Sequence, residues 1–206
     1  MDTIQLNVIN KSNDQNNSEI VIFPKNVATD MDELAVAWQV IQNLGRGSNH
    51  PFTYPMSIQV GASDSYGNFT PHLDAAVGQK FQMVHTNSGD ELELAGAASS
   101  SQELQVLNAL TKGTITANVF KAGKLFATRT NIAPSQMAAF SFKPTIWIGV
   151  ASQVTEGAVM DAAIVSSVNT EFSLFGIASA DIVMTGGGSG PDATPFQFTL
   201  ENVEMA

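Results

Sequence analysis

An all-β fold is what the sequence predicts: an antiparallel two-sheet sandwich of jelly-roll-like form, with residues 1–206 in a single domain. Short runs of residues alternate between apolar and polar, a pattern typical of half-buried strands. Gly, Asn, Asp, Ser or Pro bounds these runs, as expected of tight turns. A chain of 206 residues is within the range of single-domain sandwiches, and we see neither a long linker nor a repeat of fixed period.

The first strand candidate is IQLNVI, in which Ile, Leu and Val alternate with Gln and Asn. The polar run KSNDQNNS separates it from EIVIFPKN, so the two predict a hairpin with a long loop. The further strand candidates, in chain order, are MSIQVGA, KFQMVHT, ELELAG, ELQVLNAL, TITANVF, KLFATRT, MAAFSF, TIWIGVA, AAIVSSV, EFSLFGI, ADIVM and PFQFTLENV. Turn residues such as Ala122-Gly123 and Ser88-Gly89 lie between them, which predicts a meander of antiparallel hairpins.

One segment, residues 30–44, is compatible with a helix. Apolar residues recur there at helical spacing: Leu34, Ala37, Trp38, Ile41 and Leu44. The same stretch also alternates as a strand. We therefore expect at most one short helix, near residues 30–44, with Trp38 packed in the core in either case.

Large apolar side chains on the strand candidates predict the core. These are Phe120, Phe126, Phe140, Phe142, Ile146, Trp147, Ile148, Phe196 and Phe198. Burying one such side chain contributes roughly 1.5–3 kcal/mol. Some of them alternate onto opposite faces of their strands, so the second face also needs cover, which favours self-association.

The net charge of −10 argues against nucleic acid as a partner, because an acidic surface repels phosphates. The charges are also separated along the chain. Residues 104–155 hold five cations and no Asp or Glu, whereas residues 156–206 hold seven acids and no Lys or Arg. Only 14% of residues are charged, so small polar residues or other molecules must cover much of the surface.

This separation predicts that the basic stretch of one copy contacts the acidic stretch of another. The residues expected to carry the self-association are Lys112, Lys121, Lys124, Arg129, Asp161, Glu171 and Asp181. Two different complementary patches repeat into a ring or a filament. A competing explanation is that the basic and acidic strands are neighbours within one sheet.

The cluster GGGSGP, beginning at Gly186, is the nearest match to a phosphate-binding loop. Such a loop works because it leads from a strand into a helix N-terminus, whose free N–H groups bind the anion. Here the strand-like segment FQFTLENV follows, and no Lys occurs after Lys143. We therefore interpret the cluster as a connection between two strands and predict no nucleotide cofactor.

Metal and catalytic motifs give no clear signal. The chain has no Cys, and His50, His72 and His85 show no metal-binding spacing. The oxygen ligands of Asp64, Asn68 and Asp74 suit calcium but lack the spacing of a calcium loop, and no nucleophile elbow occurs. We predict no catalytic, cofactor or metal site, and no enzyme.

Residues 157–185 are rich in Ala, Ser, Val, Ile and Gly. They could form a strand hairpin that enters a bilayer, or core strands buried on both faces. Like pairs such as Ala162-Ala163 break strict alternation, so the second interpretation is favoured. The N-terminus lacks the basic start and apolar core of a signal peptide, which predicts a cytoplasmic protein or one exported by a non-classical route.

Three classes of function remain open. We expect a non-catalytic structural or self-assembling protein that forms homo-oligomers or filaments. The alternative is a binding or membrane-active module, lectin-like or pore-forming, whose partner is a membrane or a carbohydrate. Loops with Trp38, Tyr54 and Tyr66 favour this alternative. The third class is an enzyme with an unrecognised site.

Overall fold

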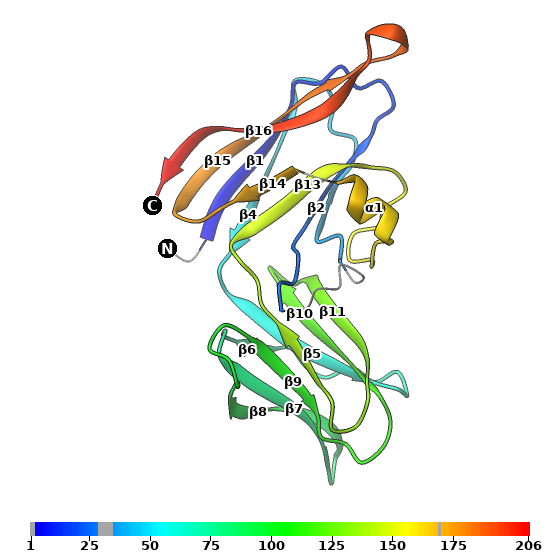
Figure 1. The fold of residues 1–206 in the computed structure, drawn as a ribbon, viewed down its shortest axis with the longest axis vertical. Helices are drawn as coiled ribbons and strands as arrows, with labels where there is room; N and C mark the ends of the chain where they lie inside the picture. Colours follow the sequence, from blue (N-terminus) through cyan, green and yellow to red (C-terminus); the bar gives the residue numbers. More distant parts are fainter. Residues whose placement is uncertain (1–2, 29–34, 169) are drawn as a thin grey trace. The chain divides into compact units, whose positions relative to one another are not determined.

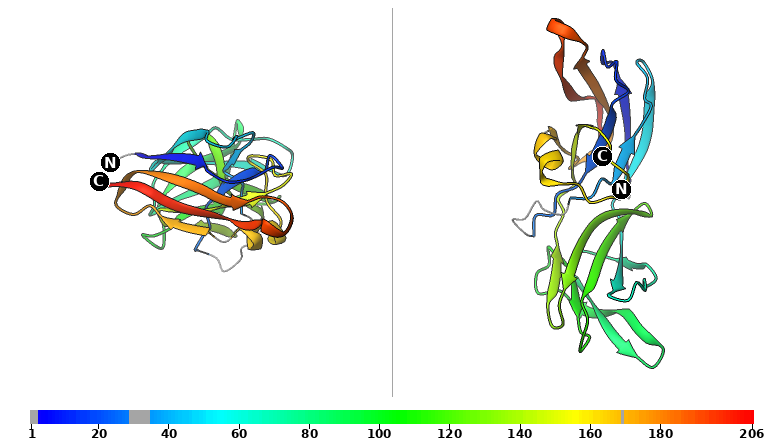
Figure 2. Two further views of the ribbon diagram at one scale, coloured as in Figure 1. Left: turned by 90° about the horizontal axis from the view of Figure 1, so that it is seen from above. Right: turned by 90° about the vertical axis from the view of Figure 1, so that its right-hand side faces the viewer.

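A computed structural model describes residues 3–28, 35–168 and 170–206. The described chain forms four sheets of four strands each, with one short α-helix and one short 3-10 helix (Figures 1 and 2). The prediction of a mostly β protein is therefore confirmed. The chain divides into two compact units, and each contains two of the sheets.

Unit 1 combines both ends of the sequence: Met1–Lys25, Ala35–Met56 and Pro144–Ala206. Its elements are β1 (Thr3–Asn10), β2 (Glu19–Phe23), β3 (Gln39–Ile41), β4 (Asn49–Pro55), β13 (Thr145–Ala151), α1 (Ala162–Ser167), β14 (Thr170–Ser173), β15 (Ile177–Gly187), η2 (Gly190–Asp192) and β16 (Thr194–Met205). One sheet has the strand order β16-β15-β1-β4, and the other has the order β14-β13-β2-β3.

Unit 2 comprises Asn26–Leu34 and Ser57–Lys143. Its strands are β5 (Ile58–Asp64), β6 (Leu73–Ala75), β7 (Gln79–Thr86), β8 (Gly89–Ala97), β9 (Leu104–Asn108), β10 (Ile115–Lys121), β11 (Lys124–Ile132) and β12 (Met137–Phe140). The sheets have the orders β11-β10-β5-β6 and β12-β9-β7-β8. The sequence predicted a single domain, and this stays a prediction for a chain that divides into these two units.

The prediction of purely antiparallel pairing is wrong at two places. Strand β1 pairs in parallel with β15, and β7 pairs in parallel with β9. The hairpins β7–β8, β10–β11 and β15–β16 do form. Turn residues specify only such local hairpins, whereas β1 and β15 come from opposite ends of the chain and no local signal marks their direction.

Alternation predicts most of the core correctly. In β1 the residues Ile4, Leu6 and Val8 are buried, while the residues between them are exposed or half-buried. Ile146, Ile148, Phe126, Phe140 and Phe198, which the sequence predicted for the core, are buried. Phe120, Phe142, Trp147 and Phe196 are only half-buried.

The helix lies elsewhere than predicted. Residues 30–34 are outside the described part of the chain, and residues 35–44 form an isolated bridge at Val36 and the strand β3 rather than a helix. The helix is α1, within a segment predicted as a core strand. Asp161 caps it by accepting a hydrogen bond of 2.8 Å from the backbone N–H of Ile164.

Helix α1 and the turns beside it cover the outer face of β2. Val165 of α1 and the adjacent Val168 belong to one apolar cluster with Val21 and Phe23. A Cβ at position 149 would lie 2.7 Å from a Val168 methyl group, so Gly149 leaves the space that Val168 fills. The second sheet face that needed cover is therefore covered here by the chain itself.

The two units have the same strand topology. When the order of unit 1 is written from β13 to β16 and then from β1 to β4, every pairing matches that of β5 to β12 in unit 2. The parallel pairs β1–β15 and β9–β7 are equivalent under this correspondence. The chain is therefore an internal repeat in which β1–β8 correspond to β9–β16.

Individual residues obey the same correspondence. Asn10 and Asn108 are both buried, and each lies opposite a methionine, Met184 or Met83, in the parallel strand. Gly61 and Gly149 also occupy equivalent register positions, 88 residues apart. The spacing of the repeat varies, because Asn10 and Asn108 are 98 residues apart, and so the sequence shows no fixed period.

Candidate self-association site

The four predicted cations all lie in unit 2. Lys112 is exposed in the turn before β10, and Arg129 is half-buried within β11. Lys121 and Lys124 face each other as register partners across the hairpin turn, where Ala122 and Gly123 both have positive φ. The sequence therefore brings these cations onto one pair of adjacent strands.

Lys121 differs from the other three because it is only 4% exposed. Burial lowers the pKa of its ammonium group to about 8, since the charged form loses its hydration. Its Nζ lies 5.2 Å from the centre of the Phe126 ring. Lys121 is thus placed inside unit 2 rather than on its surface.

Arg129 borders a hollow of about 350 Å³ in unit 2. The other lining residues are Asn131, Ile132, Gln136 and Met137. The hollow therefore offers amide groups and one cation but no carboxylate, which suits an acidic side chain more than a basic one.

The three predicted acids all lie in unit 1. Asp161 caps α1, and Glu171 is exposed on β14. Asp181, on β15, accepts hydrogen bonds of 2.6 Å from Asn202 and 2.9 Å from Asn7. These bonds stabilise the carboxylate and lower the pKa of Asp181, with the Asn202 bond as the main cause.

Asp181 is the centre of a polar row that crosses all four strands of its sheet. Asn49 of β4 donates to Asn7 of β1, Asn7 donates to Asp181 of β15, and Asn202 of β16 also donates to Asp181. A shallow hollow of about 280 Å³ lies over this row. The row presents amide and carboxylate groups on the face opposite the core.

The unequal charge follows the division into units. Unit 1 contains three Lys or Arg and ten Asp or Glu, and unit 2 contains six Lys or Arg and nine Asp or Glu. The strands with the predicted cations, β10 and β11, share a sheet with β5 and β6 only. The predicted acids of β14 and β15 lie in two different sheets, both in unit 1, so the explanation that these strands are neighbours of β10 and β11 in one sheet is wrong.

Strand β16 is the longest edge strand that the structure describes. It has 12 residues and pairs on one side with β15. Its last five residues are exposed, including Val203 at 43% and Met205 at 68%. The next longest edge strands, β8 and β11, have nine residues each, whereas β3 and β6 have three and β4 carries two prolines.

The glycine cluster connects two strands, as predicted. Gly186 and Gly187 end β15, the 3-10 helix η2 follows, and β16 pairs back onto β15. Gly186, Gly187, Gly188 and Gly190 all have positive φ. A side chain at Gly186 would overlap the Pro195 carbonyl oxygen of the partner strand, so close approach of the two backbones explains this glycine.

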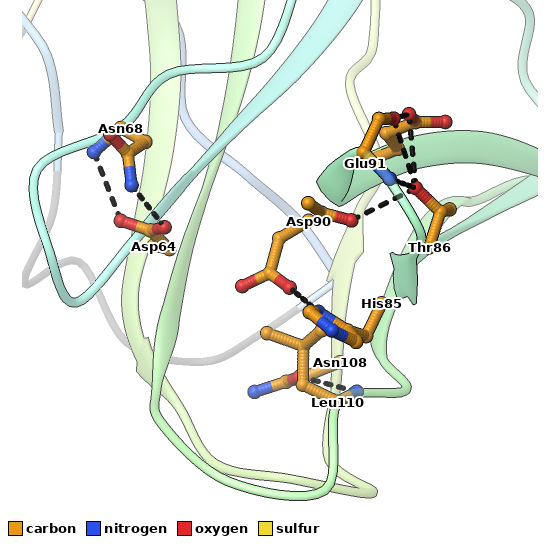
Figure 3. A network of polar contacts seen from close by, with 10 residues as sticks. Asp64, Asn68, His85, Thr86, Asp90, Glu91, Asn108 and Leu110 are labelled. Carbon is orange, nitrogen blue, oxygen red and sulfur yellow. Dashed lines mark hydrogen bonds and ion pairs between the residues drawn. The ribbon is translucent and has the colours of Figure 1, made fainter.

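The calcium candidates do not come together. Asn68 donates to Asp64 at 2.8 Å within one turn, and these hydrogen bonds lower the pKa of Asp64 (Figure 3). Asp74 instead accepts a hydrogen bond of 2.9 Å from Gln59. No cluster of three His, Cys, Asp or Glu side chains suited to a metal occurs within the described ranges.

The histidines have separate surroundings. His85 pairs with Asp90 at 2.7 Å on the β7–β8 hairpin (Figure 3). His72 stacks on Phe120 with ring centres 3.7 Å apart, and His50 lies in the other unit. His72 and His85 thus each have a contact partner of their own.

The aromatic residues expected on binding loops are mostly buried. Trp38 is fully buried, and Tyr54, against which it packs edge-on, is 2% exposed. Burial also raises the pKa of Tyr54 to about 12. Tyr66 alone of the three is exposed, at 74%.

The segment 157–185 is not a continuous strand hairpin, because α1 interrupts it. Among the residues whose structure is described, no helix has both the length and the apolar character needed to cross a membrane.

Comparison with protein-family models found no match. Comparisons with curated proteins and with solved structures likewise found none.

The sequence did not predict the pairing of N-terminal strands with C-terminal strands. In unit 1, the N-terminal strands β1 and β2 pair with the C-terminal strands β15 and β13. We call these two strand pairings the seam. One sequence feature marks the equivalent strands β1 and β9: each alternating strand ends in an asparagine, Asn10 or Asn108. Each of these side chains donates a hydrogen bond to a backbone carbonyl next to the parallel strand pair of its unit.

Proposed function

We propose that this protein is a non-catalytic structural protein that self-assembles into homo-oligomers or filaments. We further propose that each unit is a two-sheet sandwich. The alternating burial of β1 and β10 supports this arrangement, because each strand turns one face to a core and the other outward. Contacts between β13 and β16 and between β5 and β8 also join the two sheets within each unit.

The observation that carries the proposal is the separation of charge between strands that do not pair. Lys112, Lys124 and Arg129 belong to unit 2, and Asp161, Glu171 and Asp181 belong to unit 1. Patches of opposite charge on different parts of one molecule suit a head-to-tail contact between copies. Lys121 is omitted from this contact, because it is buried.

Salt and charge reversal test the proposal. Charges exposed at an interface are screened over about 8 Å at physiological ionic strength, so particle mass should fall as salt rises to about 1 M. Lys112→Glu combined with Arg129→Glu should reduce assembly about tenfold or more at low salt, which light scattering would measure. Reversal of the exposed Lys112 should change stability by about 0.5 kcal/mol or less. Arg129 is half-buried, so the melting temperature of the double variant would establish that the fold is retained.

A matched control is Arg46→Glu, which reverses an exposed cation in unit 1. It makes the acidic unit 1 more acidic and leaves Lys112, Lys124 and Arg129 of unit 2 unchanged, so assembly should persist. Particles whose mass is unaffected by salt and by the Lys112→Glu, Arg129→Glu double substitution would contradict an electrostatic contact. A single-chain mass under every condition would contradict self-assembly itself.

A further inference from the structure

We propose that unit 1 can form between two copies of the chain, with strands β1–β4 of one copy completing the fold with strands β13–β16 of a second copy. This inference rests on the proposed self-assembly and supplies its mechanism. The seam, which lies within a single chain in this structure, would then join one copy to the next.

The internal repeat shows why the seam is the place to open. In unit 2 the two equivalent sets of strands, β5–β8 and β9–β12, are joined directly by residues 98–103. In unit 1 the corresponding connection would run from β16 to β1, which a linear chain cannot make. Unit 1 is therefore built as two separate pieces, and within the chain these pieces are connected only through Ser57–Lys143.

Each piece of unit 1 already contains half of both sheets. The N-terminal piece has the pairs β1–β4 and β2–β3, and the C-terminal piece has the pairs β13–β14 and β15–β16. The division runs through the centre of each sheet, between β1 and β15 and between β2 and β13. A piece without its partner would expose two central strand edges, which strongly favour pairing with another strand.

Polar contacts as well as strand pairing define the partner of each piece. Across the seam, Lys11 N donates to Met184 O at 2.8 Å and Asn13 N donates to Gly186 O at 2.7 Å. Asn7 donates to Asp181, and Val154 N donates to Glu19 at 3.0 Å. The two backbone bonds would fit many sequences, but the bonds to Asp181 and Glu19 depend on side chains of this chain, so the occupant that fits best is a second copy.

The closed and exchanged forms contain the same seam contacts. Their balance depends on the concentration of other chains relative to the effective concentration of the piece within the same chain. Exchange should therefore increase with protein concentration. Reciprocal exchange between two copies closes a dimer, whereas exchange passed on from each copy to the next gives rings or filaments.

Single cysteines report the exchange directly, since the natural chain has no Cys. Gln5 and Ser179 are register partners across the seam, and neither is buried. Neighbouring strands lie about 4.8 Å apart, within the range that a disulfide spans. We would co-express one chain carrying Gln5→Cys with another carrying Ser179→Cys, oxidise the assembled particles, and analyse them on a denaturing, non-reducing gel.

Exchange predicts a disulfide-linked band at twice the mass of one chain, several-fold stronger than when either chain is oxidised alone. The matched control pairs Gln5→Cys with Thr53→Cys, which are register partners within the N-terminal piece. This control should give no band above background, because exchange leaves both positions in the same chain.

The outcomes separate the two proposals. Particles that form without the cross-linked band would overturn exchange and leave the proposed self-assembly standing. A single-chain mass in all preparations would overturn both. A band equally strong in the Gln5 and Thr53 control would show random collision of exposed thiols and would also overturn exchange.

Discussion

Two buried asparagines, Asn10 and Asn108, do the same work in the two units. The Nδ2 of Asn10 donates to Leu44 O at 2.6 Å, and the Nδ2 of Asn108 donates to Ile132 O at 2.8 Å. The Oδ1 of Asn108 accepts from the backbone N–H of Leu110 at 3.0 Å (Figure 3). Asn10 thus satisfies a carbonyl in the loop after β3, and Asn108 satisfies the last carbonyl of β11 and an N–H group just after β9.

The substitution Asn108→Ala should lower the free energy of unfolding by about 3 kcal/mol, because it leaves buried backbone groups without a partner. Asn10→Ala should have a similar effect in unit 1. Urea denaturation would measure both. The control Asn16→Ala, at an exposed position in the loop after β1, should cost about 0.5 kcal/mol or less. Equal effects at all three positions would contradict the assigned role.

Lys121 predicts a pH dependence of stability. Its pKa is about 8 in the folded protein, against an ordinary value of 10.5. Between pH 8 and pH 10.5 the unfolded chain therefore binds the proton more readily than the folded chain does. Stability should therefore rise as pH increases from about 8 towards 10.5, by on the order of 3 kcal/mol in total. Denaturation of the wild type and Lys121→Met at pH 7, 8, 9 and 10 would measure the rise.

In Lys121→Met the rise should be absent from that interval, whereas the control Lys112→Met, at an exposed lysine, should retain it. A wild-type stability that is flat or falling relative to Lys121→Met between pH 8 and 10 would contradict the burial of a destabilised ammonium group.

At the scale of elements, the glycine hairpin β15–β16 depends on two separable effects. Gly186 has φ of +84° and no room for a side chain, whereas Gly190 has φ of +69° and open space around it. Gly190→Ala should therefore cost about 1–2 kcal/mol from backbone strain alone. Gly186→Ala should cost more, about 3 kcal/mol or above, because the Pro195 backbone must also move.

Thermal unfolding of the two variants would compare these costs. If both alanines lowered the melting temperature equally, the close approach of the strands at Gly186 would not be important for stability. Loss of assembly in a variant that kept its melting temperature would instead indicate a binding role for the loop.

Local signals explain which elements could be predicted from the sequence. Alternation and turn residues identified the hairpin strands β7, β8, β10 and β11, because both features act over a few residues. Strand β4 was missed, since NHPFTYP contains two prolines and little alternation. Helix α1 was taken for a strand because AAIVSSV is short and apolar, and its cap Asp161 was the overlooked signal.

Local sequence signals also could not predict part of the candidate site. The separation of charge was visible in the sequence, but the burial of Lys121 depends on packing around the end of β10. The seam depends on pairing between strands from opposite ends of the chain, such as β1 and β15. Asn10 and Asn108 mark the ends of the equivalent strands β1 and β9, but they do not identify the distant strand with which each one pairs.

For the whole molecule, the internal repeat connects the fold to the proposed assembly. Two sets of equivalent strands fold into two units of the same topology, and only unit 1 is closed without a direct connection between its two pieces. The same arrangement can be completed within one chain or between chains. Self-assembly would therefore use the same strand pairings that complete unit 1.

The most direct test is the particle mass of the purified protein over a wide concentration range at low salt, by light scattering with electron micrographs of the same samples. We expect the particle mass to rise with protein concentration and the micrographs to show rings or filaments. A mass equal to one chain, 21.8 kDa, at every concentration, with no particles in the micrographs, would contradict it.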